Sequence, residues 1–319
     1  MKLLEVENLK MYYYTLRGWV RAVDDVSFSL EKGDTLGLAG ESGCGKTTAA
    51  LCILRLLPRN GKIFSGTINF DGVDILKLSN KRLQREIRWK RISTIFQGAM
   101  NSLHPTIEVG DQIVESLIIH EDITKQEAIK RAKTLLDLVG VGAERFDRYP
   151  HELSGGMKQR VMIAMSLSCN PDLVIADEPT TALDVIVEAQ VLKVIKELQS
   201  KLNLSMILIS HDLSMIADTC NKVAIMYAGK IVESGDIITI YKEPLHPYTE
   251  KLISAFPSIL GPKKEIPSIH GFPPDLLNPP SACRFHPRCD YAKEICKKQE
   301  PVSINVGKEH SVACHLIGG

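Results

Sequence analysis

The sequence predicts an α/β fold with a largely parallel core sheet. Short apolar segments with the length of buried strands alternate with segments that have helical periodicity. A glycine-rich loop follows the first such strand and precedes a helix, and an acidic pair directly follows a later strand. The alternation sets the fold class, and the polar residues that follow the strands are the first candidates for a functional site.

Each expected element has its own signal in the sequence. A helix is expected from about 47 to 57, where Pro58, Asn60 and Gly61 end it. Another is expected over 187–198, because apolar residues recur there at helical spacing, at positions 187, 191, 194, 195 and 198. Buried strands are expected at 35–39, 91–96, 173–176, 206–209 and 223–227.

The stretch from about 98 to 165 differs from the rest and is expected to be helical. Thr124 and Glu127 have the T-x-x-E spacing of a capping box, an apolar face follows them, and Gly140 is a natural stop. Beyond about residue 240 the composition changes again, and prolines gather from Pro257 onward. We therefore expect an irregular, separately built C-terminal extension.

The glycine-rich loop has the G-x-x-x-x-G-K-T pattern of a phosphate-binding loop. Glycines let the backbone wrap around phosphate groups with its amide N–H groups pointing inward, and the N-terminus of the following helix adds to the attraction. Lys46 would supply charge to the terminal phosphates, and the Thr47 hydroxyl would ligate Mg²⁺. The residues of this loop are Gly40, Glu41, Ser42, Gly43, Cys44, Gly45, Lys46, Thr47 and Thr48.

Two further strings complete the candidate site. Asp177 ends an apolar strand, where it would hold Mg²⁺, and Glu178 follows it, where it can orient and deprotonate a water molecule. Upstream, Ser154, Gly155 and Gly156 place a hydroxyl and close backbone amides at a helix start, which is a second phosphate cradle. One chain does not need two cradles for one nucleotide.

The three strings GESGCGKTT, LSGGMKQR and VIADEPT, in this order, resemble the ATPase subunits of ABC transporters. The resemblance covers most of the chain. It implies a RecA-like parallel-sheet core with an antiparallel β subdomain and a helical subdomain at about 98–165, all within an ATPase domain at 1–242. It also implies that two subunits clamp ATP head to tail, with the second cradle of one closing over the nucleotide of the other.

The resemblance assigns roles to further residues. Gln97 matches the residue that touches Mg²⁺ and the attacking water, and His211 matches the residue that contacts the γ-phosphate. Asp184, in the string Ala182-Leu183-Asp184, matches the loop that crosses between the two ATPase subunits. Tyr13 aligns best with the aromatic residue that stacks on adenine, although Tyr12 or Tyr14 could do so. Cys44 is either a reactive thiol at a helix N-terminus or a small filler.

The C-terminal extension at 243–319 resembles that of the oligopeptide and dipeptide uptake branch of the family. In that branch a four-cysteine signature holds a [4Fe–4S] cluster. Here the thiols are Cys283, Cys289, Cys296 and Cys314. Four thiolates also suit zinc, and nearby histidines keep zinc open; disulfides or no metal are further alternatives. In either metal case we expect a structural site, because this segment has few apolar residues for a core of its own.

Composition narrows the setting and the partners. The 39 basic and 38 acidic residues nearly balance, so no overall field draws the chain to nucleic acid. No apolar run approaches the roughly 20 residues that span a bilayer, and Glu5 and Glu7 interrupt any signal peptide. We therefore expect a peripheral protein on the cytoplasmic side of the cell membrane.

The resemblance implies a set of partners for such a protein. They are a second ABC ATPase subunit, expected to be a distinct chain, two transmembrane permease subunits and an extracytoplasmic substrate-binding protein. Oligopeptides or dipeptides are the expected cargo, with oligosaccharides or nickel as alternatives within the same branch. A soluble ABC ATPase acting on DNA or ribosomes is a less favoured alternative, because the chain has no long heptad run or basic arm.

Overall fold

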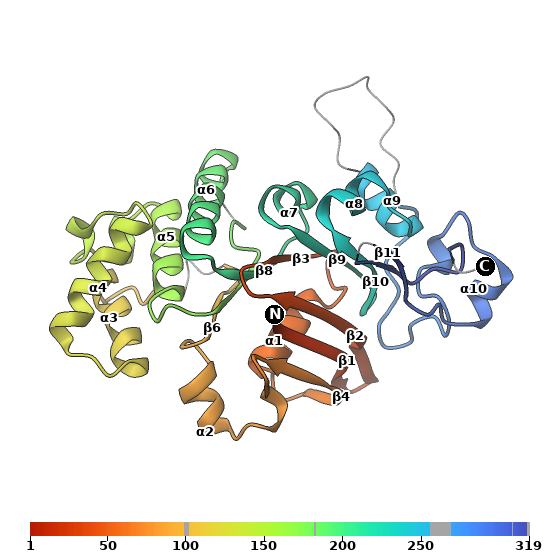
Figure 1. The fold of residues 1–319 in the computed structure, drawn as a ribbon, viewed down its shortest axis with the longest axis horizontal. Coiled ribbons are helices and arrows are strands. Elements are labelled where there is room, and N and C mark those ends of the chain that lie inside the picture. Colours follow the sequence, from red (N-terminus) through yellow and green to blue (C-terminus); the bar gives the residue numbers. More distant parts are fainter. Residues whose placement is uncertain (99–101, 182, 256–268, 308, 318–319) are drawn as a thin grey trace. The chain divides into compact units, whose positions relative to one another are not determined.

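The computed structural model describes residues 1–98, 102–181, 183–255, 269–307 and 309–317 (Figure 1). The chain divides into two compact units. The first unit combines residues 1–76 with 209–319, and the second unit contains 77–208. The two units are therefore described one after the other.

An antiparallel sheet lies in the N-terminal part of the first unit, as expected for the β subdomain. Its strand order is β2-β1-β4-β5. The first two strands form a long hairpin, in which Thr15 pairs with Gly18 at the turn (Figure 1). The strands are β1 (Lys2–Thr15), β2 (Gly18–Glu31), β4 (Gly61–Phe70) and β5 (Val73–Asp74).

A second set of strands in the first unit carries the phosphate loop. Strand β3 (Thr35–Ala39) is buried throughout and runs parallel to β9 (Lys222–Tyr227). Strand β10 (Lys230–Asp236) pairs antiparallel with β9 on one side and with β12 (His310–Val312) on the other, and β11 (Ile304–Gly307) pairs with β12. The last strands of the extension therefore continue the sheet that contains β3, which differs from the separately built extension that the composition predicts.

Helix α1 (Lys46–Leu54) follows the phosphate loop and ends earlier than the sequence predicts. Arg55 adopts the left-handed conformation at φ 50°, and the Leu56 N–H reaches back to the Leu51 carbonyl at 2.9 Å. This closure ends the helix before Pro58 does. The other helices of this unit are α7 (Leu213–Thr219), α8 (Ile237–Lys242), α9 (Pro247–Ser254), η6 (His286–Arg288) and α10 (Glu294–Lys298).

The second unit contains parallel strands and a group of helices. Strand β6 (Ile92–Ile95) pairs in parallel with β7 (Leu173–Asp177), and the strand order here is β8-β7-β6, with β8 at Ser205–Ile209. Helices α3, α4 and α5 pack on one another within the span expected to be helical (Figure 1). The helices are α2 (Asn80–Arg82), η2 (Leu83–Ile87), α3 (Val109–His120), α4 (Lys125–Leu138), η4 (Ala143–Arg145), η5 (Pro150–Glu152), α5 (Gly155–Ser166) and α6 (Val185–Leu202). A short helix, η1 (Ile75–Lys77), lies where the first unit ends and the second begins.

Local sequence signals explain two of these helices. The capping box at the start of α4 is present, because the Thr124 hydroxyl accepts from the Glu127 N–H and the Glu127 carboxylate accepts from the Thr124 N–H. In α6, Val191, Ile195 and Leu198 are buried, which is the face that the apolar spacing predicts.

Candidate nucleotide-binding site

The phosphate loop joins β3 to α1, and its glycines are required by close backbone contacts. Gly40 has φ 145° and Gly45 has φ 108°. A Cβ atom on Gly40 would lie 2.1 Å from the carbonyl oxygen of Met226, and one on Gly45 would lie 2.1 Å from that of Ala22. Any larger residue at these two positions would have to displace backbone, so the loop keeps its curvature only with glycine.

Lys46 is a buried cation in this loop, with a relative exposure of 6%. Its Nζ donates to the carbonyl oxygens of Gly40 at 2.7 Å and Glu41 at 3.1 Å. In the described part of the chain its only other hydrogen-bond partner is the Cys44 Sγ, so no carboxylate neutralises it. A buried ammonium group is costly without a counter-charge. The arrangement is therefore suited to an anionic ligand such as a polyphosphate.

The remaining loop residues are accessible or lie beside the start of α1. Ser42, Gly43 and Thr47 are exposed. The Tyr13 hydroxyl lies 3.1 Å from the Thr48 Oγ1, which places the expected adenine-stacking residue beside the first turn of α1. Tyr13, which the family resemblance favours over Tyr12 and Tyr14, thus contacts the helix that follows the phosphate loop.

Cys44 is packed inside the loop. Its relative exposure is 4%, and burial raises the pKa of its thiol despite the nearby Lys46 ammonium. A buried, protonated thiol is a poor nucleophile. Of the two roles open from the sequence, the structure favours a small filler.

His211 follows β8 and lies on the exposed surface of the first unit. The N–H of the preceding Ser210 donates to the carbonyl oxygen of Leu38 at 3.3 Å, so this turn is attached to the strand that leads into the phosphate loop. After it, Asp212 caps α7 by accepting from the Ser214 N–H at 2.7 Å. His211 therefore sits in a turn that is fixed on both sides.

In the second unit, the acidic pair lies at the end of β7: Asp177 is its last residue, and Glu178 follows it. Asp177 is buried at the end of the strand. Glu178 has φ 46°, a left-handed conformation that non-glycine residues adopt rarely and at an energetic cost. Backbone strain of this kind concentrates at functional sites, and here it falls on the residue expected to act as the base.

The Glu178 carboxylate is oriented by two neighbours of the same unit. The Gln97 Nε2 donates to its Oε2 at 2.8 Å, and the Thr181 Oγ1 donates to the same oxygen at 3.1 Å. The structure thus brings together Gln97 and Glu178, which follow two different strands. Thr181 was not among the expected residues, although a hydroxyl three positions after the acid is a visible signal.

The Ser-Gly-Gly turn begins α5. Ser154 is the N-cap and accepts from the Met157 N–H at 3.4 Å, and both Ser154 and Gly155 are exposed. Gly156 is buried against α6, because a Cβ atom there would lie 2.4 Å from the Cγ1 of Val187. The turn therefore presents its hydroxyl outward while its second glycine allows close helix packing.

Asp184 begins the neighbouring helix in the same way. It caps α6 by accepting from the Val187 N–H at 2.9 Å, and the next two residues are exposed, Val185 at 80% and Ile186 at 72%. Ala182 of the same expected loop lies outside the described residues. The start of α6 therefore exposes two apolar side chains to solvent.

Gln159 is a functional candidate that the sequence reasoning missed. It lies in α5, is buried, and its side-chain amide donates to the carbonyl oxygen of Pro179, directly after the acidic pair. Thr180 is held as well, because its hydroxyl donates to Glu188 at 2.7 Å. The available signal for Gln159 was its place in the string LSGGMKQR, as a polar residue on the side of the helix that is buried.

The four cysteines of the extension gather in one region without forming a complete ligand set. The Cys283 N–H donates to the Cys296 carbonyl oxygen at 3.1 Å. Burial raises the pKa of Cys283 to about 11, and the neighbouring Cys296 and Cys314 add to the increase. Among the described residues, however, no group of three or more His, Cys, Asp or Glu side chains is arranged to hold a metal ion. The geometry of these residues thus does not support the expected metal-binding site of the extension.

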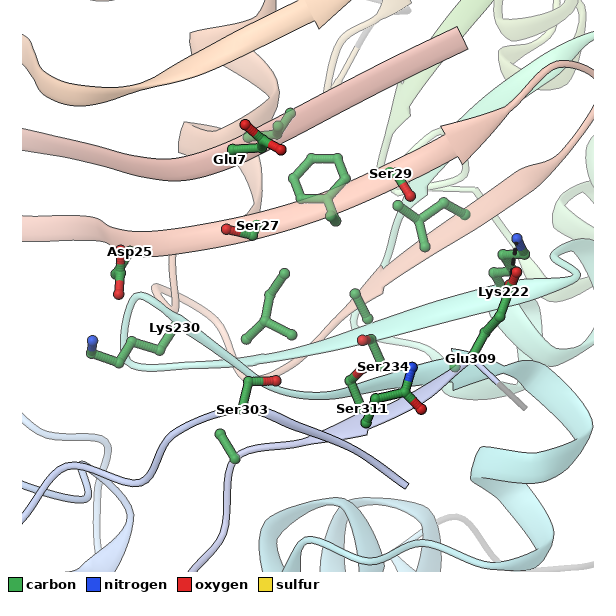
Figure 2. A pocket seen from close by; sticks show the side chains of 18 of the residues that line it. Glu7, Asp25, Ser27, Ser29, Lys222, Lys230, Ser234, Ser303, Glu309 and Ser311 are labelled. Atoms are coloured by element: carbon green, nitrogen blue, oxygen red, sulfur yellow. Dashed lines mark ion pairs between the residues drawn. The ribbon is translucent and has the colours of Figure 1, made fainter. Parts of the chain in front are cut away.

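A cavity of about 870 Å³ lies elsewhere in the first unit (Figure 2). Figure 2 shows that Glu7, Ser27 and Ser29 line it from the antiparallel sheet, opposite Ser234 and Ser311. Its lysines are paired with acids: Lys222 lies 2.9 Å from Glu309, and Lys230 contacts Glu300. None of the expected site residues lines this cavity, so it is distinct from the phosphate loop.

A phosphate loop, an acidic pair after a buried strand and a capped Ser-Gly-Gly helix together define an ATPase of the ATP-binding-cassette class. Residues 23–181 match the family model described as ABC transporter, and residues 232–296 match the one described as oligopeptide/dipeptide transporter, C-terminal region. The chain belongs to the ABC transporter family.

Two relatives of the same bacterium are similar over almost the whole chain. The chain is 46% identical to the oligopeptide transport ATP-binding protein OppD of Bacillus subtilis, over 99% of this chain and 89% of that protein. It is 45% identical to the dipeptide transport ATP-binding protein DppD of Bacillus subtilis, over 99% and 95%. The expected family is confirmed.

The fold is also similar to that of a solved bacterial ABC transporter cassette, the dimeric structure of MJ0796. The TM-score is 0.65 at 25% identity, over 73% of this chain and 98% of that chain. Within the described residues, no helix is both long and apolar enough to cross a membrane.

Proposed function

We propose that this chain is the ATP-hydrolysing subunit of an importer for oligopeptides or dipeptides. The observation that carries the proposal is the buried Lys46 ammonium, which is held by carbonyl oxygens inside a glycine loop and lacks a carboxylate partner among the described residues. A triphosphate supplies the missing charge. The names of both Bacillus subtilis relatives and the description of the C-terminal family model support peptides as cargo.

In this proposal the loop and the acidic pair act on one ATP molecule. Lys46 and the amides of Gly40–Thr48 bind the phosphates, Tyr13 stacks on adenine, and His211 contacts the γ-phosphate. Thr47, Asp177 and Gln97 would hold Mg²⁺, which would supply charge neutralisation at the phosphates. A hydroxyl, a buried carboxylate and an amide oxygen are hard oxygen donors of the kind that Mg²⁺ prefers.

Glu178 is the proposed general base for the attacking water. Its carboxylate is oriented by the hydrogen bonds from Gln97 and Thr181. Phosphoryl transfer to water depends mainly on positioning and charge neutralisation, which suits a base held in this way.

We further propose that two ATPase subunits pair head to tail, so that Ser154, Gly155 and Gly156 of one close over the nucleotide of the other. The exposure of Ser154 and Asp184, together with the exposed Val185 and Ile186, supports a surface available for such pairing. The similar cassette MJ0796 was solved as a dimer. Clamping of this kind needs several kcal/mol of differential affinity, which contacts to the γ-phosphate can supply.

The remaining partners follow from membership of the family. They are a second, distinct ABC ATPase, two transmembrane permease subunits and an extracytoplasmic substrate-binding protein, with this chain on the cytoplasmic face of the membrane. No nucleic acid is involved. Oligosaccharide or nickel import is the second candidate, and an uptake assay with the assembled transporter separates the cargoes. We assign residues 1–242 to the ATPase domain and 243–319 to the extension.

For the extension, we propose a structural [4Fe–4S] cluster held by Cys283, Cys289, Cys296 and Cys314, with zinc as the alternative. The backbone hydrogen bond from Cys283 to Cys296 supports a shared site, as does the effect of Cys296 and Cys314, which add to burial in raising the pKa values of Cys283 and Cys289. Iron and sulfide in anaerobically purified protein, and their loss in Cys283→Ser, support the cluster. Stoichiometric zinc in the wild type supports the alternative.

The proposed function is tested by Lys46→Ala. We expect ATP binding, measured by titration calorimetry on the full chain, to be abolished, because the buried positive charge is removed. Lys32→Ala removes an exposed lysine of the same unit and should bind ATP as the wild type does. Unchanged ATP affinity in Lys46→Ala contradicts the proposed site.

A further inference from the structure

Glu41, the second residue of the phosphate loop, is paired with an arginine of the C-terminal extension. The Arg288 Nη1 donates to its Oε2 at 2.7 Å, and the Nη2 donates to its Oε1 at 3.0 Å. The two residues lie 247 positions apart, and Arg288 directly precedes Cys289. A two-pronged contact between guanidinium and carboxylate fixes orientation as well as distance.

The arginine is built into its place. Its relative exposure is 8%, and its remaining N–H groups are all used. The Nε donates to the His270 carbonyl oxygen at 2.8 Å, the Nη1 also donates to the Tyr227 hydroxyl at 3.3 Å, and the Nη2 also donates to the Gly271 carbonyl oxygen at 3.3 Å. A guanidinium group with five engaged donors holds Glu41 in one position.

The backbone of Glu41 is held from the extension too. Its N–H donates to the Tyr248 hydroxyl at 2.9 Å. Tyr248 is fully buried, and its ring centroid lies 4.7 Å from that of Tyr227 and 5.4 Å from that of Phe285. The carbonyl oxygen of Glu41 in turn accepts from Lys46. The extension therefore fixes the residue whose carbonyl positions the phosphate-binding lysine.

We propose that Arg288 is a positioning residue for ATP binding. It neutralises a carboxylate that lies within the phosphate loop, where an unpaired negative charge would repel the triphosphate. It also fixes the loop residue that supports Lys46. This inference rests on the proposed ATP site. Because the base Glu178 lies on another part of the chain, the effect of Arg288 falls on ATP affinity and leaves turnover at saturating ATP largely unchanged.

The test compares variants of the full chain by calorimetric titration with ATP and Mg²⁺. In Arg288→Gln we expect about tenfold weaker ATP binding, because a charge-assisted contact is lost and Glu41 is left unpaired. In the double variant Glu41→Gln/Arg288→Gln, removal of the repelling carboxylate restores most of the affinity. Lys297→Gln removes an exposed ion pair of the same extension and should bind ATP as the wild type does.

Steady-state kinetics provide a second measurement. For Arg288→Gln we expect the KM for ATP to rise while kcat stays within about twofold of the wild type. If Arg288→Gln does not fold, Arg288→Lys replaces it, since it keeps the charge and loses the two-pronged geometry; we expect about threefold weaker ATP binding. Wild-type affinity in either arginine variant overturns the proposal.

Failure of this proposal is distinguishable from failure of the ATP site. If Arg288→Gln binds ATP normally and Lys46→Ala does not, the role of Arg288 is wrong and the site stands. If Lys46→Ala also binds ATP normally, the proposed function is wrong. Weak binding that Glu41→Gln does not restore means that Arg288 only supports the fold of the extension, which also overturns the positioning role.

Discussion

The side-chain amide of Gln97 donates a hydrogen bond to the carboxylate of Glu178 at 2.8 Å, although the residues are 81 positions apart. The parallel pairing of β6 with β7 explains the contact. Glu178 directly follows the end of β7, and Gln97 lies two residues beyond the end of β6, so both lie at the same edge of the sheet. The proposed base is therefore oriented by a residue at the end of the neighbouring strand.

Replacement of Gln97 tests that orientation. In Gln97→Leu we expect kcat to fall at least about tenfold, because a misplaced base loses part of the contribution of general base catalysis. Phosphate release at saturating ATP measures the effect. Thr181→Val removes the weaker second donor and should reduce kcat less. A wild-type kcat in Gln97→Leu shows that the hydrogen bond has no role in turnover.

The proposed head-to-tail pairing of two ATPase subunits is tested at Ser154, where the charge can be changed without loss of the helix cap. Ser154→Asp and Ser154→Asn both keep a side-chain acceptor for the Met157 N–H, so α5 should remain capped. Only the aspartate places a negative charge where the partner's triphosphate is proposed to bind. We expect ATP-dependent pairing, measured by light scattering, to be lost in Ser154→Asp and kept in Ser154→Asn. Equal pairing in both variants contradicts the second cradle.

Acid should destabilise the first unit through His246. Burial lowers the pKa of His246 to about 3, and its Nδ1 accepts from the Tyr248 N–H at 3.0 Å, so the folded ring is neutral. The unfolded ring has a pKa of about 6.5. Because the folded pKa is the lower one, the unfolded state binds more protons between these values. The contribution of His246 to the free energy of unfolding is therefore fully present above about pH 6.5. It decreases below that pH, by up to about 1.4 kcal/mol per pH unit.

His246→Asn measures that contribution. Asparagine keeps an acceptor for the Tyr248 N–H at the start of α9 and cannot be protonated. We expect the free energy of unfolding in urea to vary less with pH in this variant than in the wild type, between about pH 6.5 and 5. Identical pH profiles show that His246 is not the titrating group.

Helices α4 and α6 were predicted correctly because their signals come from residues close together in the sequence. The capping box of Thr124 and Glu127 needs only three residues of spacing, and α4 begins there. The buried face of α6 follows from apolar periodicity in the same way. The end of α1 was missed, because Arg55 has no residue-type signal for the left-handed conformation that closes the helix.

Contacts between distant segments were not visible in the sequence. Nothing near Arg288 in the sequence indicates that its partner is Glu41, because that pairing depends on how the C-terminal extension packs on the phosphate loop within the first unit. The pairing of β12 with β10 has the same cause. The nucleotide site could be anticipated because its residues lie in short strings with fixed spacing, and Gln97 and His211 came only from the family resemblance.

The central claim is that this chain binds ATP at the Lys46 loop and hydrolyses it with Glu178 as the base. The most direct measurement compares ATP binding and phosphate release in Glu178→Gln, with Glu115→Gln, at an exposed position of α3, as the control. We predict that Glu178→Gln binds ATP with near wild-type affinity while its turnover falls at least about a hundredfold. Hydrolysis at the wild-type rate in Glu178→Gln would contradict the account.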